Sequence, residues 1–312
     1  MIEQNTVFVL GAGASKPYGF PVGAELHKLI CGRRRDDTYS LPKRFQDTNF
    51  SVTEVEQFVR AFERSGQPSI DAFIEARQEF DWIGRCAIAE FLCEHEDPNV
   101  AFNPNTEGNW YKALWRDMTN PDGNPNTAAS NVKFLTFNYD RSLEHFFFTA
   151  AKHTFRIADE GAYQFLKTIA IQHVYGELGE FHYLPGDYRR QYSKNPAGRE
   201  VDTAANGIHL IGAGRKDAGP FQKARDWFKQ ANVICFLGFG FDPTNVERLG
   251  LEDAIRERLR DGGTSKLIIA STLGKTQAQV DRIKSQLCPS ASLWKHYNAD
   301  NLGTLASAGL VR

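Results

Sequence analysis

Residues 8–21 read FVLGAGASKPYGFP, and this stretch decides the fold class. An apolar run that begins at Val7 passes directly into Gly11-Ala-Gly-Ala-Ser15, whose side chains are small or absent. A run of this kind, followed by glycines and a helical pattern, is typical of a buried strand, a tight turn and a helix in an α/β protein. Residues between such a strand and helix lie at the carboxyl edge of an open sheet, where ligands bind.

The small residues of this turn have two explanations. They allow a diphosphate to approach the backbone, where helix N–H groups attract it, or they form a tight turn that has no ligand. The dinucleotide fingerprint G-x-G-x-x-G is incomplete, because Lys16 occupies the position of its third glycine. Asp36 and Asp37 lie at roughly the distance expected of a ribose-binding acid, but no second strand precedes them. The turn by itself leaves both explanations open.

Other short apolar runs predict the rest of an α/β fold, a Rossmann-like and mostly parallel sheet flanked by helices. The expected strands begin at Val7, Val132, Ile169, Val233 and Lys266, with 209–211 as a possible further strand. Helical patterns predict helices over 22–30, 53–64, 70–94, 142–152, 220–231, 245–260 and 275–287.

The segment 31–130 differs from the rest of the chain, because it has helical periodicity and little strand character. It closes with the turn-rich sequence NPDGNPN at 120–126. We therefore expect a discontinuous nucleotide-type domain, formed by 1–30 and 131–312, with an inserted helical module over 31–130.

Composition excludes several classes of protein. The 312 residues carry a formal net charge of −1, without the basic excess that broad nucleic-acid binding requires. The five cysteines are scattered and none has CxxC spacing, so we expect neither a disulfide framework nor a zinc site, and we assign no metal ligands. The N-terminal segment lacks the pattern of a signal peptide, and no apolar run approaches the roughly 20 residues of a membrane helix. These features predict a cytoplasmic protein without membrane contact.

Three further segments place polar or glycine residues directly after predicted strands. They read LTFNYD at 135–140, QHVYG at 172–176 and LGFGFDP at 237–243. In a parallel sheet all three meet the first glycine turn along one edge, and this convergence favours a binding site.

Each of these residues also has a purely structural explanation. Asn138 or Asp140 can cap the helix that starts near Ser142, and His173 can be a core histidine with satisfied hydrogen bonds. Gly238 and Gly240 can be ordinary turn glycines.

Together these segments resemble the sirtuin superfamily. Gly11-Ala-Gly-Ala-Ser15 with Gly19-Phe-Pro21 resembles the GAG-x-S…GIP opening of the family, and Thr136-Phe-Asn-Tyr-Asp140 resembles its TQNID motif. His173 resembles its catalytic histidine, and Gly238-Phe-Gly-Phe241 resembles its later GTS stretch. The four-cysteine zinc ribbon of protein-deacylating sirtuins is absent from the sequence, so the chain looks more like the sirtuin-like NADases of bacterial anti-phage defence.

The resemblance implies that NAD is the substrate and that it is cleaved to nicotinamide and ADP-ribose. Asn138 and His173 are then the catalytic pair, with His173 as the base because an imidazole of ordinary pKa accepts a proton at neutral pH. Asp140 would hold the nicotinamide carboxamide. The expected roles of the other residues are as follows: the diphosphate cradle is Gly11, Ala12, Gly13, Ala14 and Ser15; the nicotinamide pocket is shaped by Phe20 and Pro21; the adenosine ribose lies against Gly238, Phe239 and Gly240.

Two other functions are compatible with the same residues. One is NAD-dependent protein deacylation, against which the missing zinc cysteines count. The other is a module that senses NAD or ADP-ribose without turning it over. For the NADase, the resemblance further implies a homo-oligomer and a defence partner such as a HerA-type ATPase or an Argonaute protein, and we expect the 31–130 module to form the contact surface.

Overall fold

The computed structural model describes residues 2, 4–32, 40–46, 48–67, 69–119, 131–194, 198–209, 219–263, 265–287 and 293–311. The sequence features at 33–37 and 120–126, and most of the possible strand at 209–211, lie outside these residues.

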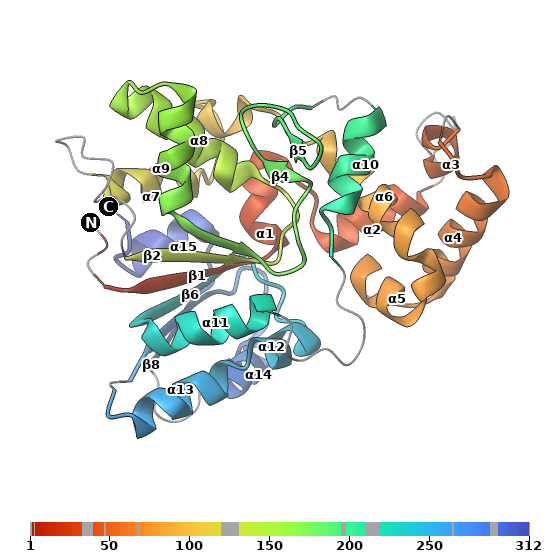
Figure 1. Cartoon of the computed structure of the whole chain (residues 1–312). Helices are drawn as coiled ribbons and strands as arrows, with labels where there is room; N and C mark the ends of the chain where they lie inside the picture. The colour runs from red at the N-terminus through yellow and green to blue at the C-terminus, as the bar shows by residue number, and fades with distance from the viewer. Residues whose placement is uncertain are drawn as a thin grey trace.

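A six-stranded sheet forms the centre of the molecule, in the order β3-β2-β1-β6-β7-β8. Every neighbouring pair is parallel, which confirms the predicted α/β class with a parallel sheet (Figure 1). The strand bounds are β1 Thr6–Leu10, β2 Val132–Thr136, β3 Ala170–His173, β6 Val233–Leu237, β7 Leu267–Ser271 and β8 Leu293–Tyr297, with a separate two-stranded pair of β4 Glu180–Phe181 and β5 Arg189–Arg190.

The burial of the strands matches their positions in the sheet. All five residues of β1 and of β6 are buried, as expected for central parallel strands covered on both faces. The chain reverses the direction of winding between β1 and β6, because β2 and β3 lie on one side of β1 while β7 and β8 extend beyond β6. Such a switch point is where open α/β sheets bind ligands.

Helices cover the sheet and extend away from it. In Figure 1, α8 and α9 lie above β2, whereas α11 and α13, which pack against each other, lie below β6. The helix bounds are α1 Ala12–Ser15, α2 Gly23–Cys31, α3 Leu41–Arg44, α4 Val52–Arg64, α5 Ile70–Ala76, α6 Asp81–Cys93, α7 Trp110–Met118, α8 Ser142–Phe155, α9 Asp159–Thr168, α10 Gly198–Asn206, α11 Gly219–Gln230, α12 Pro243–Leu249, α13 Leu251–Arg260, α14 Gln277–Leu287 and α15 Asn301–Ser307, with 3-10 turns η1 Lys16–Tyr18, η2 Gln78–Phe80 and η3 Val100–Phe102.

The described part of the segment 31–130 contains helices and no strand. Its helices α3, α4 and α5 project to one side in Figure 1, whereas α7 lies beside the sheet and packs against α8 and α15. The buried indole N–H of Trp110 donates to the main-chain oxygen of Ala14, 2.9 Å away. The segment is therefore divided between a projecting group and a helix that supports the first glycine turn.

Two long helices expected from the sequence are broken. The 70–94 pattern is interrupted after α5, where Arg77 has the non-helical dihedral angles φ −134° and ψ 71°. The 245–260 pattern is interrupted at Gly250, whose φ of 58° ends α12 before α13 begins. Sequence pattern did not mark either break, because apolar residues recur on both sides of it. None of the described helices is both long and apolar enough to cross a membrane.

Candidate functional site

The two glycine turns of the sheet edge lie against each other. Gly11 N–H donates to the main-chain oxygen of Leu237 at 3.1 Å, and Gly13 N–H donates to that of Gly238 at 3.0 Å. A Cβ on Gly11 would lie 2.7 Å from the oxygen of Gly238, and a Cβ on Gly238 would lie 2.0 Å from Ala14 N. The missing side chains are therefore explained by contact between two protein backbones, and this contact uses the N–H groups of Gly11 and Gly13.

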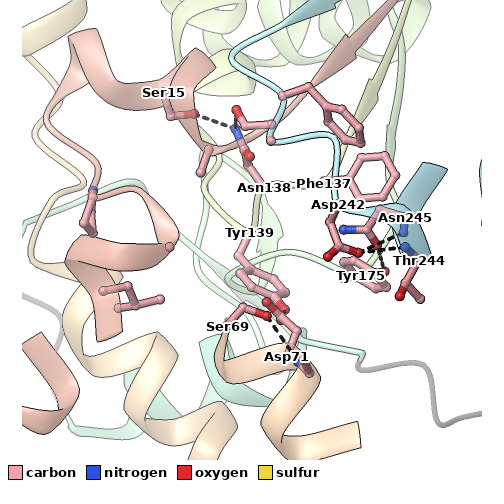
Figure 2. A pocket seen from close by; sticks show the side chains of 18 of the residues that line it. Ser15, Ser69, Asp71, Phe137, Asn138, Tyr139, Tyr175, Asp242, Thr244 and Asn245 are labelled. Atoms are coloured by element: carbon pink, nitrogen blue, oxygen red, sulfur yellow. Dashed lines mark hydrogen bonds between the residues drawn. The ribbon is translucent and has the colours of Figure 1, made fainter. Parts of the chain in front are cut away.

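A cavity of about 450 Å³ opens at this edge, beside the carboxyl ends of β1, β2 and β6 (Figure 2). Its volume is in the usual range for small-molecule sites. Nine of the predicted site residues line it, namely Gly11, Ala12, Ser15, Phe20, Pro21, Asn138, Asp140, Phe239 and Gly240. The remaining four do not appear among its lining residues, namely Gly13, Ala14, His173 and Gly238. All four predicted segments thus contribute to one cavity, the third through Tyr175 and not through His173.

Asn138 joins the ends of β1 and β2 through its side-chain amide. Its Nδ2 donates to the main-chain oxygen of Gly11 at 3.0 Å and to Ser15 Oγ at 2.9 Å. Both amide hydrogens are used in this way, whereas Oδ1 has no hydrogen-bond partner among the described residues and is not buried. Asn138 does not cap α8, whose N-cap residue is Arg141. Asn138 lines the cavity, and its Oδ1 atom is therefore an unused hydrogen-bond acceptor at the site.

Asp140 is a buried carboxyl group that also lines the cavity. Its Oδ1 accepts hydrogen bonds from the backbone N–H of Ser142, at 3.1 Å, and from the Ser142 hydroxyl. Burial raises the pKa of Asp140 above its ordinary value, although the hydrogen bonds from Ser142 oppose the shift. It therefore both holds the start of α8 and presents a carboxyl group to the cavity.

His173 lies behind Asn138 and contacts its backbone. Nδ1 is 2.8 Å from the main-chain oxygen of Asn138, and since a carbonyl oxygen only accepts, Nδ1 carries the hydrogen. Nε2 is 2.8 Å from Glu144 Oε1. Burial opposes the charged imidazolium, but the adjacent Glu144 carboxylate prevails and raises the pKa of His173 to about 9. Both ring nitrogens are occupied, and His173 reaches the site through the backbone of Asn138.

The sequence did not predict that residues of α5 and its N-cap form one side of the cavity. Ser69, Asp71 and Glu75 line the cavity opposite the sheet edge, and the Tyr139 hydroxyl donates to Asp71 Oδ1. These residues belong to the 31–130 segment, and no local motif marks them. Their position depends on a long-range contact between α5 and the end of β2.

A second polar group attaches α5 to α12. The guanidinium of Arg248 donates to both carboxylate oxygens of Glu75, at 2.8 and 3.1 Å, and to the Tyr175 hydroxyl at 3.0 Å. The Tyr175 hydroxyl in turn donates to Asn245 Oδ1. Helix α5, helix α12 and the loop after β3 thus share one hydrogen-bond network at the cavity.

The charged side chains that line the cavity are mainly acidic. Among the residues that the structure describes, they are Asp71, Glu75, Asp140 and Asp242, with Arg248 as the one cation. Burial raises the pKa of Asp71, although its hydrogen bond from Tyr139 opposes the shift. An acid-rich, partly enclosed lining favours a ligand that brings a positive charge or several hydroxyl groups.

Comparisons with known proteins add no family assignment. Neither the protein-family models nor the curated proteins include a match to this chain. The fold, the cavity and the residues that line it therefore carry the functional argument.

Proposed function

We propose that this protein hydrolyses NAD to nicotinamide and ADP-ribose, as the resemblance to the sirtuin-like NADases implies. The observation that carries the proposal is the arrangement of Asn138 at the cavity. Its amide hydrogens are fixed by Gly11 and Ser15, so its oxygen is held in one orientation. A fixed, neutral acceptor of this kind suits a ribose hydroxyl or an attacking water.

The lining of the cavity suits the charge changes of this reaction. Nicotinamide in NAD is a cationic leaving group, and its departure leaves an oxocarbenium-like ribose. The electron pair of the broken carbon–nitrogen bond leaves with the nicotinamide nitrogen. Water then bonds to the anomeric carbon and releases a proton. When ionised, the carboxyl groups of Asp71 and Asp140 place negative charge near both cationic species, and a bound cation in turn favours their ionised forms. Phe20 and Pro21 supply an apolar wall for the nicotinamide ring.

In this proposal His173 acts through Asn138. The imidazole fixes the Asn138 backbone by its Nδ1–H bond and is itself held by Glu144. His173 is then a positioning residue, and the proton released by water leaves through solvent or a carboxylate of the cavity. This replaces the role of general base that the sequence predicted, because both ring nitrogens are already hydrogen-bonded.

The test is to incubate the purified chain with NAD and to quantify nicotinamide and ADP-ribose by chromatography, alongside the particle mass. Asn138→Ala should lower nicotinamide release by on the order of 10²-fold. Asn105→Ala, which removes an exposed asparagine outside the cavity, should leave it unchanged. Equal rates for the parent protein and a folded Asn138→Ala variant would reject the proposal.

A second candidate function is a module that binds NAD or ADP-ribose without turnover. It is favoured by the engagement of both ring nitrogens of His173, which leaves no free imidazole base at the cavity. Stoichiometric NAD binding by calorimetry, with no nicotinamide released in any assembly state, would select it. The NADase proposal includes a role in anti-phage defence as a homo-oligomer with an ATPase or Argonaute partner. The particle mass tests whether the chain forms a homo-oligomer.

A further inference from the structure

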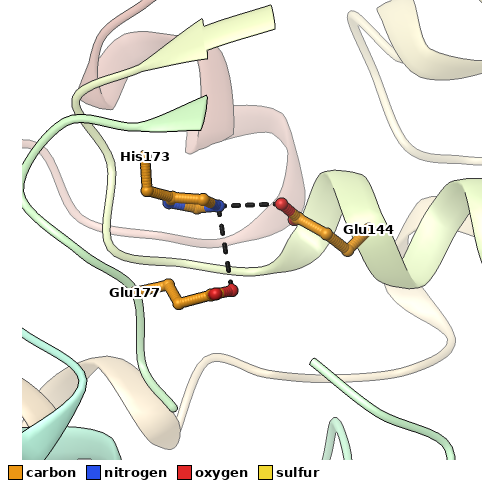
Figure 3. Close-up of side chains that lie close together, drawn as sticks. All are labelled: Glu144, His173 and Glu177. Carbon is orange, nitrogen blue, oxygen red and sulfur yellow. Dashed lines mark hydrogen bonds and ion pairs between the residues drawn. The ribbon is translucent and has the colours of Figure 1, made fainter. Parts of the chain in front are cut away.

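Glu144, His173 and Glu177 come from two segments, α8 and the end of β3 with the loop after it, and meet behind the cavity. Glu144 is on α8, His173 ends β3, and Glu177 follows in the next loop. His173 Nε2 lies 2.8 Å from Glu144 Oε1 and 4.0 Å from Glu177 Oε2. One ligating atom from each residue lies within 4.8 Å of the others. Figure 3 shows both carboxylates directed at the same ring nitrogen.

The orientation of His173 is that of a metal-binding histidine. Its Nδ1–H donates to the main-chain oxygen of Asn138, so Nε2 is the ring atom directed at the two carboxylates, and a metal ion would bind there in place of the Nε2 hydrogen. Ligating histidines commonly donate their second ring N–H to a backbone carbonyl, since this fixes the tautomer and the plane of the ring. The hydrogen bond that orients a ligating histidine, here from Nδ1–H to Asn138, is therefore already present.

Glu144 provides an independent observation. Its side chain is 9% exposed, and its Oε2 atom is buried without a hydrogen-bond partner. A buried, unpartnered carboxylate oxygen is costly unless a cation compensates it. The nearby guanidinium of Arg141 is already bonded to Glu96 and to main-chain oxygens, including that of Gly179. The carboxylate of Glu144 thus retains an unused acceptor in the protein interior.

We propose that Glu144, His173 and Glu177 form a binding site for a first-row divalent transition-metal ion. One imidazole nitrogen and two carboxylate oxygens suit Zn²⁺, Mn²⁺ or Fe²⁺ better than Mg²⁺, which prefers oxygen ligands and water. Three protein ligands leave a fourth position for water, as in open zinc sites. Glu177, whose side chain is 29% exposed, gives the ion a route from solvent.

This site goes beyond the proposed NAD chemistry and does not rest on it. No metal site was expected from the sequence, because its cysteines lack the spacing of a zinc site and Glu144 and His173 lie 29 positions apart. A bound ion would fix the His173 ring and, through Nδ1–H, the backbone of Asn138. It would therefore control the rigidity of the cavity wall.

The test uses the full chain without a histidine tag, stripped with a chelator and titrated with Zn²⁺ alone by calorimetry. We expect one Zn²⁺ per chain, a higher melting temperature, and much weaker binding of Mg²⁺. Glu177→Gln should weaken Zn²⁺ binding by at least about tenfold. Glu79→Gln, which alters an exposed carboxylate paired with Arg77, should leave it unchanged. No stoichiometric uptake, or equal affinity in folded Glu177→Gln, would overturn the proposal.

Because a substitution in this cluster can disturb folding, the parent protein provides a second test. Co²⁺ bound to nitrogen and oxygen ligands has a visible absorption band that reports its coordination. We expect one equivalent of Co²⁺ to produce this band and Zn²⁺ to abolish it. A featureless spectrum at one equivalent would count against the site, whatever the variants do. Neither readout uses NAD, so a failure here is distinct from a failure of the proposed function.

Discussion

The side-chain amide of Asn138 is hydrogen-bonded to Ser15 Oγ over 2.9 Å, which joins the end of β2 to the turn after β1. These residues lie 123 positions apart in the sequence. The bond fixes the direction in which the amide oxygen points, and the proposed NAD chemistry depends on that direction.

The first prediction follows from this bond. Ser15→Ala removes one acceptor of the Asn138 amide but leaves the bond to Gly11 in place, so the amide oxygen loses only part of its orientation. We expect nicotinamide release to fall by about tenfold, less than in Asn138→Ala. The measurement is steady-state NAD hydrolysis in both variants. A Ser15→Ala loss as large as that of Asn138→Ala would show that Ser15 has a direct role of its own.

The second prediction concerns the contact between the two glycine turns. Gly238→Ala places a Cβ 2.0 Å from Ala14 N at a φ of 55°, so backbone strain and overpacking add together. We expect the free energy of unfolding to fall by about 3 kcal/mol, measured by urea denaturation. Gly240→Ala is the matched control, because nothing lies within 4 Å of its added Cβ. Equal losses in the two variants would contradict the packing argument.

The third prediction uses the buried Lys266 ammonium, which donates to the main-chain oxygens of Lys229 and Ala231. Burial lowers the pKa of Lys266 to about 7, against an ordinary value of about 10.4 in the unfolded chain. Between these two values the unfolded state binds more protons, so this group makes stability rise with pH from about 7 to about 10.

Lys266→Met should therefore flatten the rise of stability with pH and stabilise the protein at pH 7. The two carbonyl oxygens remain hydrogen-bonded, because Arg258 also donates to both. The measurement is urea denaturation at pH 6.5 and pH 9, with the exposed Lys43→Met as control. An unchanged pH slope would mean that Lys266 stays charged in the folded protein.

The fourth prediction concerns the attachment of α5 to α12. Arg248 and Glu75 form a two-bonded ion pair in which the side chains are only 13% and 18% exposed. In a double-mutant cycle with Arg248→Met and Glu75→Met we expect a coupling energy of about 1–2 kcal/mol. The exposed pair of Lys16 and Glu25, treated in the same way, should give no more than about 0.5 kcal/mol. Similar couplings for both pairs would show that burial adds nothing to the first.

Local pattern was sufficient for the central strands and for most of the cavity edge. The runs at Val7 and Val233 are apolar throughout and the run at Val132 is mostly apolar, because parallel strands are covered on both faces, so they were recognisable without structural information. Strand β8 was missed because it lies at the edge of the sheet, where only Trp294 and Tyr297 of Leu293–Tyr297 are partly buried and the other positions are exposed. The break at Arg77 was missed because apolar residues, such as Ile74 and Phe80, continue on both sides of it.

The sequence by itself determined the parallel α/β sheet and the sheet edge at which Gly11, Ser15, Asn138 and Phe239 meet. Buried strands and tight turns can be recognised in this way because both depend on residues that are neighbours in the sequence. Only the tertiary structure decided that Asp71 closes the cavity, that Gly238 packs against the first glycine turn, and that His173 faces Glu144 and not the cavity. These relationships join residues far apart in the chain. Their geometry depends on how whole elements pack, which no local pattern encodes.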